Sequence, residues 1–283
     1  MPPFHNADTD TWVNKSFSLE EAVQATTRLA IGAHQDDLEF MAYEGISACY
    51  GREGKWFTGI TVSDGRGSSR VGPYSKYNND EMRNIRREEQ RKAAEIGQYA
   101  AQFQLDYKSS QIKGPERTAV TEDIVDILLQ MRPDTIYLHQ PADKHDTHVA
   151  VLAASIEALR QTIDHHMPKR IIGCEVWRGL DWLSDSEKVT MDYGENPELF
   201  EKLTLTFDSQ IKGGKRYDLA VKGRCRANAT FYDSHSPDQA ELITWGIDLT
   251  PLIHDTSLTI SDFILRHINQ LTQDVKSRVD QFL

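Results

Sequence analysis

The feature that most constrains the fold is an alternation of short apolar runs with longer segments of helical pattern between residues 28 and 177. The runs have the length and composition of buried strands, and the segments between them place apolar residues at helical spacing or favour helix by composition. Strands that alternate with helices predict βα units and a mainly parallel sheet. The predicted strands cover 28–33, 56–63, 134–139 and 171–177, and the predicted helices cover 80–101 and 149–163.

We therefore expect a three-layer, Rossmann-like α/β fold in which a mainly parallel sheet has helices on both faces. A capping box at Ser18–Glu21 predicts a first short helix, so the polar residues 1–17 are expected to form a loosely held arm. Residues 18–195 are expected to form the α/β domain that carries the chemistry. Residues 196–283 are expected to form an α+β extension packed on it, with a helix at 197–210, a strand near 242–249 and a helix at 257–282.

Charge and composition exclude several classes of partner. The chain has 32 Lys and Arg against 43 Asp and Glu, a net charge of −11, which gives no broad electrostatic reason to bind nucleic acid or an anionic membrane. No run approaches the ~20 apolar residues that span a bilayer, and the N-terminus lacks the pattern of a secretion signal. Three widely spaced cysteines fit a reducing compartment, so we expect a cytoplasmic protein.

Two polar clusters directly follow predicted strands. His34-Gln35-Asp36-Asp37 follows the first strand, and the segment 139–148, which holds three of the ten histidines, follows the strand at 134–139. Ligands of open α/β sheets bind beyond the carboxyl ends of the strands, so we expect the two clusters to meet.

Three protein ligands and one open position are typical of a catalytic zinc site. His34, one of the two adjacent aspartates and His148 would supply them, and the second aspartate could then serve as a base for water. The plainer interpretation is that these are solvated turn and helix-capping residues. The spacing of these residues does not distinguish the two interpretations. The position of the two clusters at strand ends favours the metal site.

The motifs themselves resemble the PIG-L/LmbE-like family of zinc-dependent N-deacetylases. That family carries AHPDDxE, TDGExG, an R-x-E helix ending in LG, and HxDH, in this order. The matching segments here are AHQDDLE at 33–39, TVSDGRGS at 61–68, RREEQRKAAEIG at 86–97 and HDTHVA at 145–150. The likeness covers most of residues 28–160, and KLTLTFDSQ at 202–210 is similar to the family's later helix ending in SQ.

The resemblance implies an LmbE-like fold and a hydrolase that removes the N-acetyl group of an amino sugar such as N-acetylglucosamine, free or within an oligosaccharide. It implies that His34, Asp37 and His148 ligate Zn²⁺, with Co²⁺ or Fe²⁺ as other possible ions. It also implies that Asp36 is the general base and that a protonated His145 faces the forming oxyanion.

Two positions depart from the family pattern. Gln35 replaces a proline, which predicts a small change in the rigidity of the turn. Thr147 replaces the aspartate of HxDH, which would hold the catalytic histidine. Asp143 and Asp146 are the nearby carboxylates that could take over this role for His145.

Other residues are candidates for substrate contacts. Among the basic residues of the helix at 80–101, Arg86 is the one expected to turn into the pocket. Trp177 could stack on a sugar ring and Arg178 could donate to hydroxyl groups, although a core position is the plainer interpretation of Trp177. Glu39 is interpreted as structural, because an acidic residue is favoured in the first turn of a helix.

Two other functions stay open at this level. His34-x-Asp36 with His148 also matches the facial triad of non-haem iron(II) oxygenases, although those sites are usually built on all-β folds. The missing HxDH aspartate also fits a sugar-binding or metal-binding protein without catalysis. The long helix at 257–282 could form an interface in a homo-oligomer.

Overall fold

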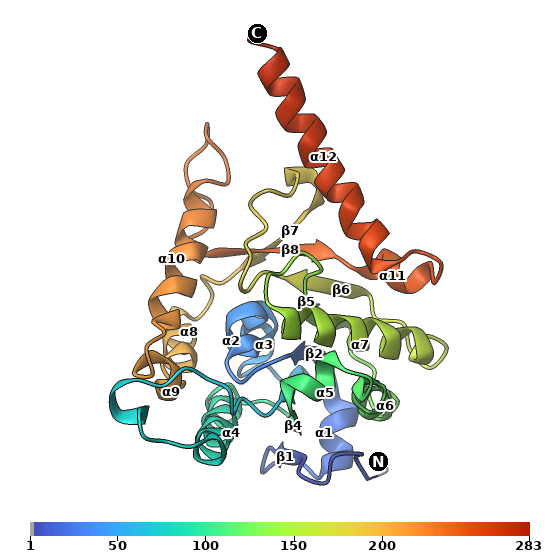
Figure 1. The fold of residues 1–283 in the computed structure, drawn as a ribbon, viewed down its shortest axis with the longest axis vertical. Helices are drawn as coiled ribbons and strands as arrows, with labels where there is room; N and C mark the ends of the chain where they lie inside the picture. Colours follow the sequence, from blue (N-terminus) through green and yellow to red (C-terminus); the bar gives the residue numbers. More distant parts are fainter. Residues whose placement is uncertain (1–2) are drawn as a thin grey trace.

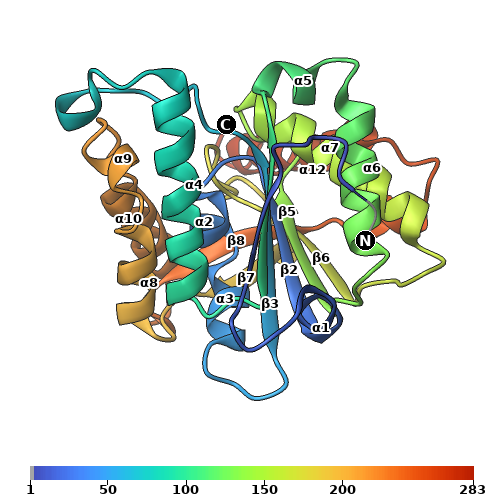
Figure 2. The same cartoon turned by 90° about the horizontal axis from the view of Figure 1, so that it is seen from below.

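The computed structural model describes residues 3–283 as one eight-stranded sheet with helices on both faces, which confirms the expected fold class (Figures 1 and 2). The strand order is β1-β4-β3-β2-β5-β6-β8-β7, and β4, β3, β2, β5 and β6 are parallel. The strands are β1 (Asp10–Val13), β2 (Thr26–Gly32), β3 (Trp56–Ser63), β4 (Ala101–Tyr107), β5 (Thr135–His139), β6 (Arg170–Cys174), β7 (Lys188–Asp192) and β8 (Ile243–Asp248).

Figure 2 shows the sheet edge-on between two helical layers, with α5, α6 and α7 on one side and α2, α3 and α4 on the other. The helices are α1 (Leu19–Ala25), α2 (Asp37–Met41), α3 (Tyr43–Cys49), α4 (Asn79–Ile96), α5 (Ser109–Lys113), α6 (Arg117–Leu128), α7 (Asp146–Thr162), α8 (Pro197–Thr204), α9 (Asp208–Ile211), α10 (Tyr217–Thr230), α11 (Thr250–His254) and α12 (Ile260–Asp280).

Each face of the sheet has its own apolar core. One core packs β-strand residues such as Ile31 and Phe103 against α6 and α7, and the other packs Ala30 and Phe57 against α2, α3 and α8. Alternate side chains of a strand point to opposite faces, so the continuous apolar runs of the sequence serve both cores at once.

The expected loose arm over residues 1–17 is wrong for the part that the structure describes. Asp10–Val13 pair antiparallel with β4 at the edge of the sheet, the ring of His5 lies 2.8 Å from an Asp123 oxygen, and Asn6 donates to the carbonyl of Leu105 at 2.8 Å. An edge strand is held by backbone hydrogen bonds along one side, so a polar sequence can form it without an apolar pattern.

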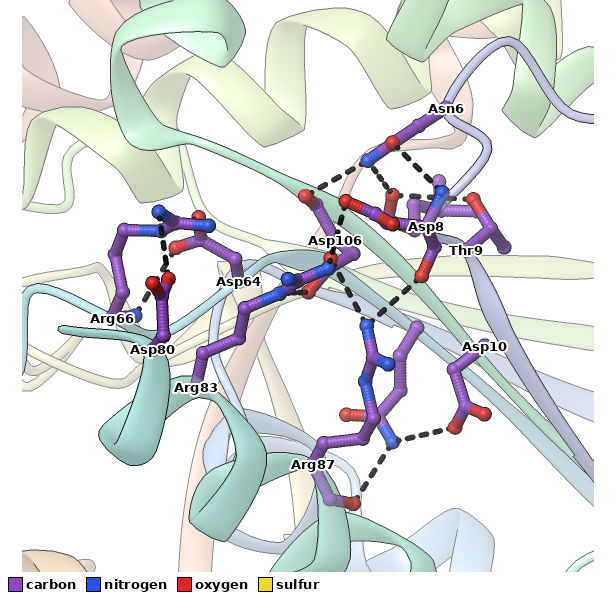
Figure 3. A network of polar contacts seen from close by, with 12 residues as sticks. Asn6, Asp8, Thr9, Asp10, Asp64, Arg66, Asp80, Arg83, Arg87 and Asp106 are labelled. Carbon is purple, nitrogen blue, oxygen red and sulfur yellow. Dashed lines mark hydrogen bonds and ion pairs between the residues drawn. The ribbon is translucent and has the colours of Figure 1, made fainter.

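Ion pairs fasten the same edge to α4 (Figure 3). Arg83 and Arg87 both point to Asp106, Arg87 at 3.0 Å, and Arg83 also lies 3.1 Å from Asp8. The backbone of Asp106 is left-handed, with φ of 63°. Two guanidinium groups on one buried carboxylate satisfy its oxygens and hold the end of β4 against α4.

Two predicted helices are shorter than expected. The helix at 80–101 ends at Ile96, and the chain turns through Gly97 into β4, which the sequence did not predict. The helix at 197–210 divides into α8 and α9. The strand near 242–249 is β8 and the helix at 257–282 is α12, which Figure 1 shows projecting from the body of the molecule.

The C-terminal residues join the same sheet, because β8 lies between β6 and β7. Helices α8, α9 and α10 form a wall outside α2 and α4 (Figure 2). Ser209 of α9 ties this wall to α4, since its N–H and hydroxyl donate to Glu89 at 2.7 and 2.6 Å. Strands on both sides of residue 17 and of residue 195 belong to the same sheet. The domain boundaries at these two positions stay predictions. No described helix combines the length and the apolar character that crossing a membrane requires.

Candidate metal-dependent active site

The two polar clusters meet where the strand order reverses. β3 and β4 extend from one side of β2, and β5 and β6 from the other. The loop after β2 carries His34 to Asp37, and the loop after β5 leads through Asp143 and His145 into α7. The crevice at such a switch point is the usual ligand site of an open α/β sheet.

His34, Asp37 and His148 form a triad of potential ligands, in which Asp37 and His148 are buried and His34 is partly exposed. His34 Nδ1 lies 3.1 Å from His148 Nε2 and 3.3 Å from Asp37 Oδ2, and His148 Nε2 lies 3.4 Å from the same oxygen. Ligands of tetrahedral zinc at about 2.0–2.1 Å from the ion stand about 3.3 Å from one another. The three donor atoms therefore fit a single divalent ion of this size.

Two further histidines lie near the triad. His139 Nε2 is 3.4 Å from Asp37 Oδ2, but it also accepts the N–H of Ala33 at 2.9 Å, so its lone pair is already used. The ring nitrogens of His34, His145 and His148 also come within reach of one ion. Of His139 and His145, only His145 lines the cavity described below, where it could contact a ligand or a substrate.

Asp143 holds the second nitrogen of His148. Its Oδ2 atom lies 3.1 Å from His148 Nδ1, and its Oδ1 atom accepts the backbone N–H of His145 at 3.2 Å. A carboxylate on the far nitrogen fixes the ring so that the other nitrogen faces the metal position. The prediction that Asp143 or Asp146 holds the ring of His145 is therefore wrong: Asp143 acts on His148.

Asp146 takes no part in the site. It is exposed in the first turn of α7, and it does not line the cavity. It lies two residues before His148, which is about 200° around a helix, so the fold that points His148 inward turns Asp146 to solvent.

Asp36 occupies a constrained position between the triad and Arg86. Its φ is 98°, and its N–H donates to Gln90 Oε1 at 3.2 Å, which fastens the turn to α4. Its Oδ2 atom is buried without a hydrogen bond among the described residues and lies 3.3 Å from Arg86 Nη2. Burial raises the pKa of Asp36 well above its ordinary value, and the charge of Arg86 opposes this shift.

The pKa of the adjacent carboxylate, Asp37, is shifted in the opposite direction. Burial alone would raise the pKa of Asp37, but His148 and His139 reverse this and hold it well below its ordinary value. Burial also lowers the pKa of His34 and of His148. An ionised carboxylate beside two neutral imidazoles is the protonation state that binds a divalent cation.

His145 stands over the triad at the cavity. Its ring centroid is 4.9 Å from that of His34, and its Nδ1 atom has no hydrogen-bond partner among the described residues. Burial and the neighbouring histidines lower the pKa of His145 to about 4. The surroundings thus favour a neutral ring rather than the expected imidazolium, and a neutral ring can still donate one N–H.

A cavity of about 790 Å³ opens from the metal position. Trp177 lines it, with its ring 5.8 Å from that of His145, and Arg86 also lines it, bonded to the carbonyl of Gln35 and to Ser68. The expected contact from Arg178 is wrong: this side chain is exposed outside the cavity, because the bend after β6 turns it away from its neighbour Trp177.

Residues that the sequence did not single out complete the site. Tyr217 is the first residue of α10 and Lys215 lies in the turn before it, and the ring of Tyr217 lies 6.1 Å from that of Trp177. Asp64 of the segment 61–68 also lines the cavity and pairs with Arg66. Only Asp64 lay in a recognisable motif. Glu39 is fully buried against Tyr99 and Gln90, as a structural residue would be.

Comparison with protein families gives one match to this part of the chain. Residues 29–159 match the model of the family PIG-L, GlcNAc-PI de-N-acetylase. This part of the chain is similar to PIG-L domains. The match spans β2 to α7 and so includes every residue of the triad, Asp36 and His145. No curated protein sequence matches the chain.

Solved structures share the fold of this protein at low sequence identity. N,N'-diacetylchitobiose deacetylase from Pyrococcus horikoshii is 16% identical with a TM-score of 0.62, and the match covers 85% of this chain and 90% of that one. The hydratase GalB of Pseudomonas putida, which acts on 4-carboxy-2-hydroxymuconate, is 17% identical with a TM-score of 0.61 over 79% and 95%. The A40926 pseudoaglycone deacetylase Dbv21 is 15% identical with a TM-score of 0.56 over 80% and 97%.

Proposed function

We propose that the protein is a zinc-dependent hydrolase that removes the acetyl group from an N-acetylated amino sugar. The observation that carries the proposal is the triad of His34, Asp37 and His148 beside a cavity, with a second carboxylate, Asp36, next to it. The PIG-L match and the deacetylases among the structural neighbours support the same chemistry.

The triad would hold the ion, and a bound zinc would polarise the acetamide carbonyl and lower the pKa of water. Asp36 would accept the proton of the attacking water and return it to the leaving amine. Its raised pKa brings this carboxyl closer to the range in which it can do both near neutral pH. Arg86, 3.3 Å away, would hold Asp36 in place and steady its charged form.

His145 and Trp177 would act on the substrate itself. His145 would donate a hydrogen bond to the carbonyl oxygen, which gains negative charge in the tetrahedral transition state. Trp177 offers an apolar ring face to the sugar. The planes of the Trp177 and His145 rings are tilted by 38° from each other, and their centroids are 5.8 Å apart.

The iron(II) oxygenase interpretation has less support. It requires Asp36 as the carboxylate ligand, but Asp37 is the aspartate between the two histidines, and Asp36 faces Arg86. The sheet is also mainly parallel and covered by helices, unlike the all-β folds typical of those sites.

A screen for acetate and free amine over N-acetylated sugars tests the proposal. Each sugar is incubated with the protein and zinc, with cobalt, or with a chelator. Release of acetate and amine in equal amounts, lost with the chelator, is the expected result. If the metal-loaded protein binds N-acetylated sugars and releases no acetate from any of them, the proposal is wrong and a binding function replaces it.

A further inference from the structure

We propose that the protein forms a homodimer in which helix α12 packs antiparallel against α12 of a second copy. The contact is a stripe of exposed side chains, called the α12 stripe below. It consists of Leu265, Ile268, Thr272, Val275 and Val279 of α12 and of Phe282 directly after it. Every residue of α12 is described and none of them lines the cavity, so this inference does not rest on the proposed function.

One face of α12 is already occupied by the body of the protein. Phe263 and Ile264 are buried in the core that also holds α6 and α7. The ring of His267 lies 4.9 Å from that of Phe263, and its Nδ1 atom lies 3.9 Å from a Glu187 oxygen. At 3.6 residues per turn, the α12 stripe lies roughly a quarter of a turn around the helix from this face. The stripe is therefore a second face, on a helix that projects from the body (Figure 1).

The α12 stripe is apolar and exposed along its whole length. Its five large apolar side chains are between 37% and 83% exposed. The hydroxyl of Thr272 donates to the carbonyl of Ile268 at 3.0 Å, so this polar group is used within the helix and the methyl group can join the stripe. A contiguous apolar patch of this kind on a soluble protein marks an interaction site.

The spacing within the stripe indicates that the partner is another helix. Successive members are separated by 3, 4, 3, 4 and 3 positions, which is the heptad repeat of a coiled coil. Such a repeat averages 3.5 residues per turn and stays in contact with a partner only when two helices wind around each other. It also gives a narrow seam, whereas a helix that lies on a broad surface has a wider apolar face.

The charge of α12 favours a second copy of this chain as the partner. The chain has a net charge of −11, so two copies repel each other over most of their surfaces. The Lys, Arg and Asp side chains of α12 are three basic and three acidic: Arg266, Lys276, Arg278, Asp262, Asp274 and Asp280. Two copies can therefore approach each other along this helix with little electrostatic repulsion.

The residues beside the stripe favour an antiparallel pair. Asp262, Asn269 and Lys276 follow one another at intervals of seven, so they lie on one flank of the stripe. Antiparallel helices bring this flank of both copies together, and pairing centred at Asn269 places Asp262 of one copy opposite Lys276 of the other. Neither side chain has an ion-pair partner within residues 3–283. Parallel helices would instead place Lys276 beside Leu271 of the second copy.

α12 presents the stripe in a helix that is already formed. Its first turn is capped by Thr259, whose hydroxyl oxygen accepts the N–H of Asp262 at 3.0 Å, and is anchored by the buried side chains of Phe263 and Ile264. Association therefore requires no new helix nucleation and little ordering of the backbone. Pairing would remove five large apolar side chains of each copy from water, which is the driving force of the contact.

Sedimentation equilibrium of the full chain tests the inference. Over about 1–100 µM we expect the wild type to reach twice the mass of a single chain. Ile268→Glu combined with Val275→Glu places charges in the stripe and should raise the dissociation constant at least about tenfold. Both positions are exposed in one copy, so the circular dichroism of this double variant should match that of the wild type. A wild type that stays monomeric over the whole range would overturn the inference.

Gln270→Glu combined with Ser277→Glu is the matched control. Both residues are exposed and lie on the side of α12 away from the stripe, so the control adds the same two negative charges outside the proposed contact. We expect it to dimerise like the wild type. If both double variants weaken the dimer equally, general repulsion rather than the stripe determines the mass, and the inference fails.

Exchange of two charges tests the antiparallel arrangement. Lys276→Glu sets two carboxylates opposite each other at both ends of the pair and should raise the dissociation constant about fivefold or more. Asp262→Lys should act in the same way, and the two substitutions together should restore the wild-type value. Helicity is compared among the variants, because an acidic residue is favoured in the first turn of a helix. A combined variant no tighter than Lys276→Glu alone would overturn the antiparallel pair.

A membrane surface is the other partner that an apolar stripe on a helix could bind. Helices that bind membrane surfaces are rich in Lys and Arg on their polar face, whereas α12 has as many acidic as basic side chains. We therefore expect no sedimentation of the protein with vesicles of phosphatidylcholine and phosphatidylglycerol. A monomeric protein that sediments with these vesicles, and loses this binding with Ile268→Glu and Val275→Glu, would assign the stripe to membranes and overturn the homodimer.

Discussion

His148 is held from both sides of its ring: Nδ1 lies 3.1 Å from Asp143 Oδ2, and Nε2 lies 3.4 Å from Asp37 Oδ2. The side chains of His148 and Asp143 are both fully buried, so the ring has one orientation available. The geometry assigns to Asp143 the task that the absent HxDH aspartate would have in the family pattern, but on the metal ligand and not on His145.

Asp143→Asn should therefore weaken metal binding. The amide keeps the shape but loses the charge that orients the ring and raises its basicity, which typically costs about 10–100-fold in affinity. Competition with a chromophoric chelator measures the dissociation constant for zinc. Asp146→Asn is the control, since this exposed residue lies outside the cavity, and equal affinities of the two variants would contradict the assignment.

Asp36→Asn should greatly slow turnover and keep the metal. Asp36 faces Arg86 and stands outside the triad, so its loss removes a base and no ligand. We expect kcat to fall by at least about 100-fold with an unchanged zinc content. Steady-state kinetics and elemental analysis on one preparation check both parts. Retained activity would remove Asp36 as the base, and lost zinc would make it a ligand.

His145→Ala should lower kcat with little change in metal affinity. A hydrogen bond to the developing oxyanion contributes about 10²–10³ in rate. The measurement is kcat on saturating substrate together with the zinc dissociation constant. Because His145 also comes within reach of an ion shared by His34 and His148, a large loss of zinc affinity would show that His145 is a ligand.

The ligand triad could be predicted from the sequence because its members lie in two short motifs that directly follow apolar strands. The parallel sheet brings adjacent strand ends together, so His34 and His148 meet although they are separated by 114 positions. Asp37 and Asp36 could not be distinguished by spacing alone. The left-handed turn at Asp36, with φ of 98°, decides which carboxylate faces the histidines.

Other features depend on tertiary contacts that leave no local pattern. β4 reads AQFQLDY, yet all its residues are buried: Gln102 donates to Thr61 at 3.0 Å and Gln104 to the carbonyl of Arg87 at 3.0 Å. The amide nitrogens of these buried glutamines donate hydrogen bonds inside the fold, but glutamines look polar in the sequence, which predicts no strand at 101–107. Lys215 and Tyr217 reach the cavity only because α10 packs beside α9 and α8.

Glu39 should make the stability of the protein depend on pH. Burial raises the pKa of Glu39 from 4.5 to about 7, although Tyr99 and Gln90 donate to its Oε1 atom at 2.7 and 2.9 Å. Between these two pH values the folded state binds more protons than the unfolded state. The contribution of Glu39 to the free energy of unfolding is therefore fully present below pH 4.5 and is lost as the pH rises through about 7.

Glu39→Gln removes this titration, since the amide carbonyl can accept the same two hydrogen bonds and carries no charge at any pH. Relative to the wild type, the variant should gain stability between pH 5 and pH 8, by up to about 3 kcal/mol at the upper end. Urea unfolding at closely spaced pH values measures the difference in the free energy of unfolding between the variant and the wild type. The contributions of all other titrating groups cancel in this difference. Glu88→Gln, an exposed residue of α4, is the control, and parallel curves for wild type and Glu39→Gln would mean that Glu39 is already ionised at pH 5 in the folded protein.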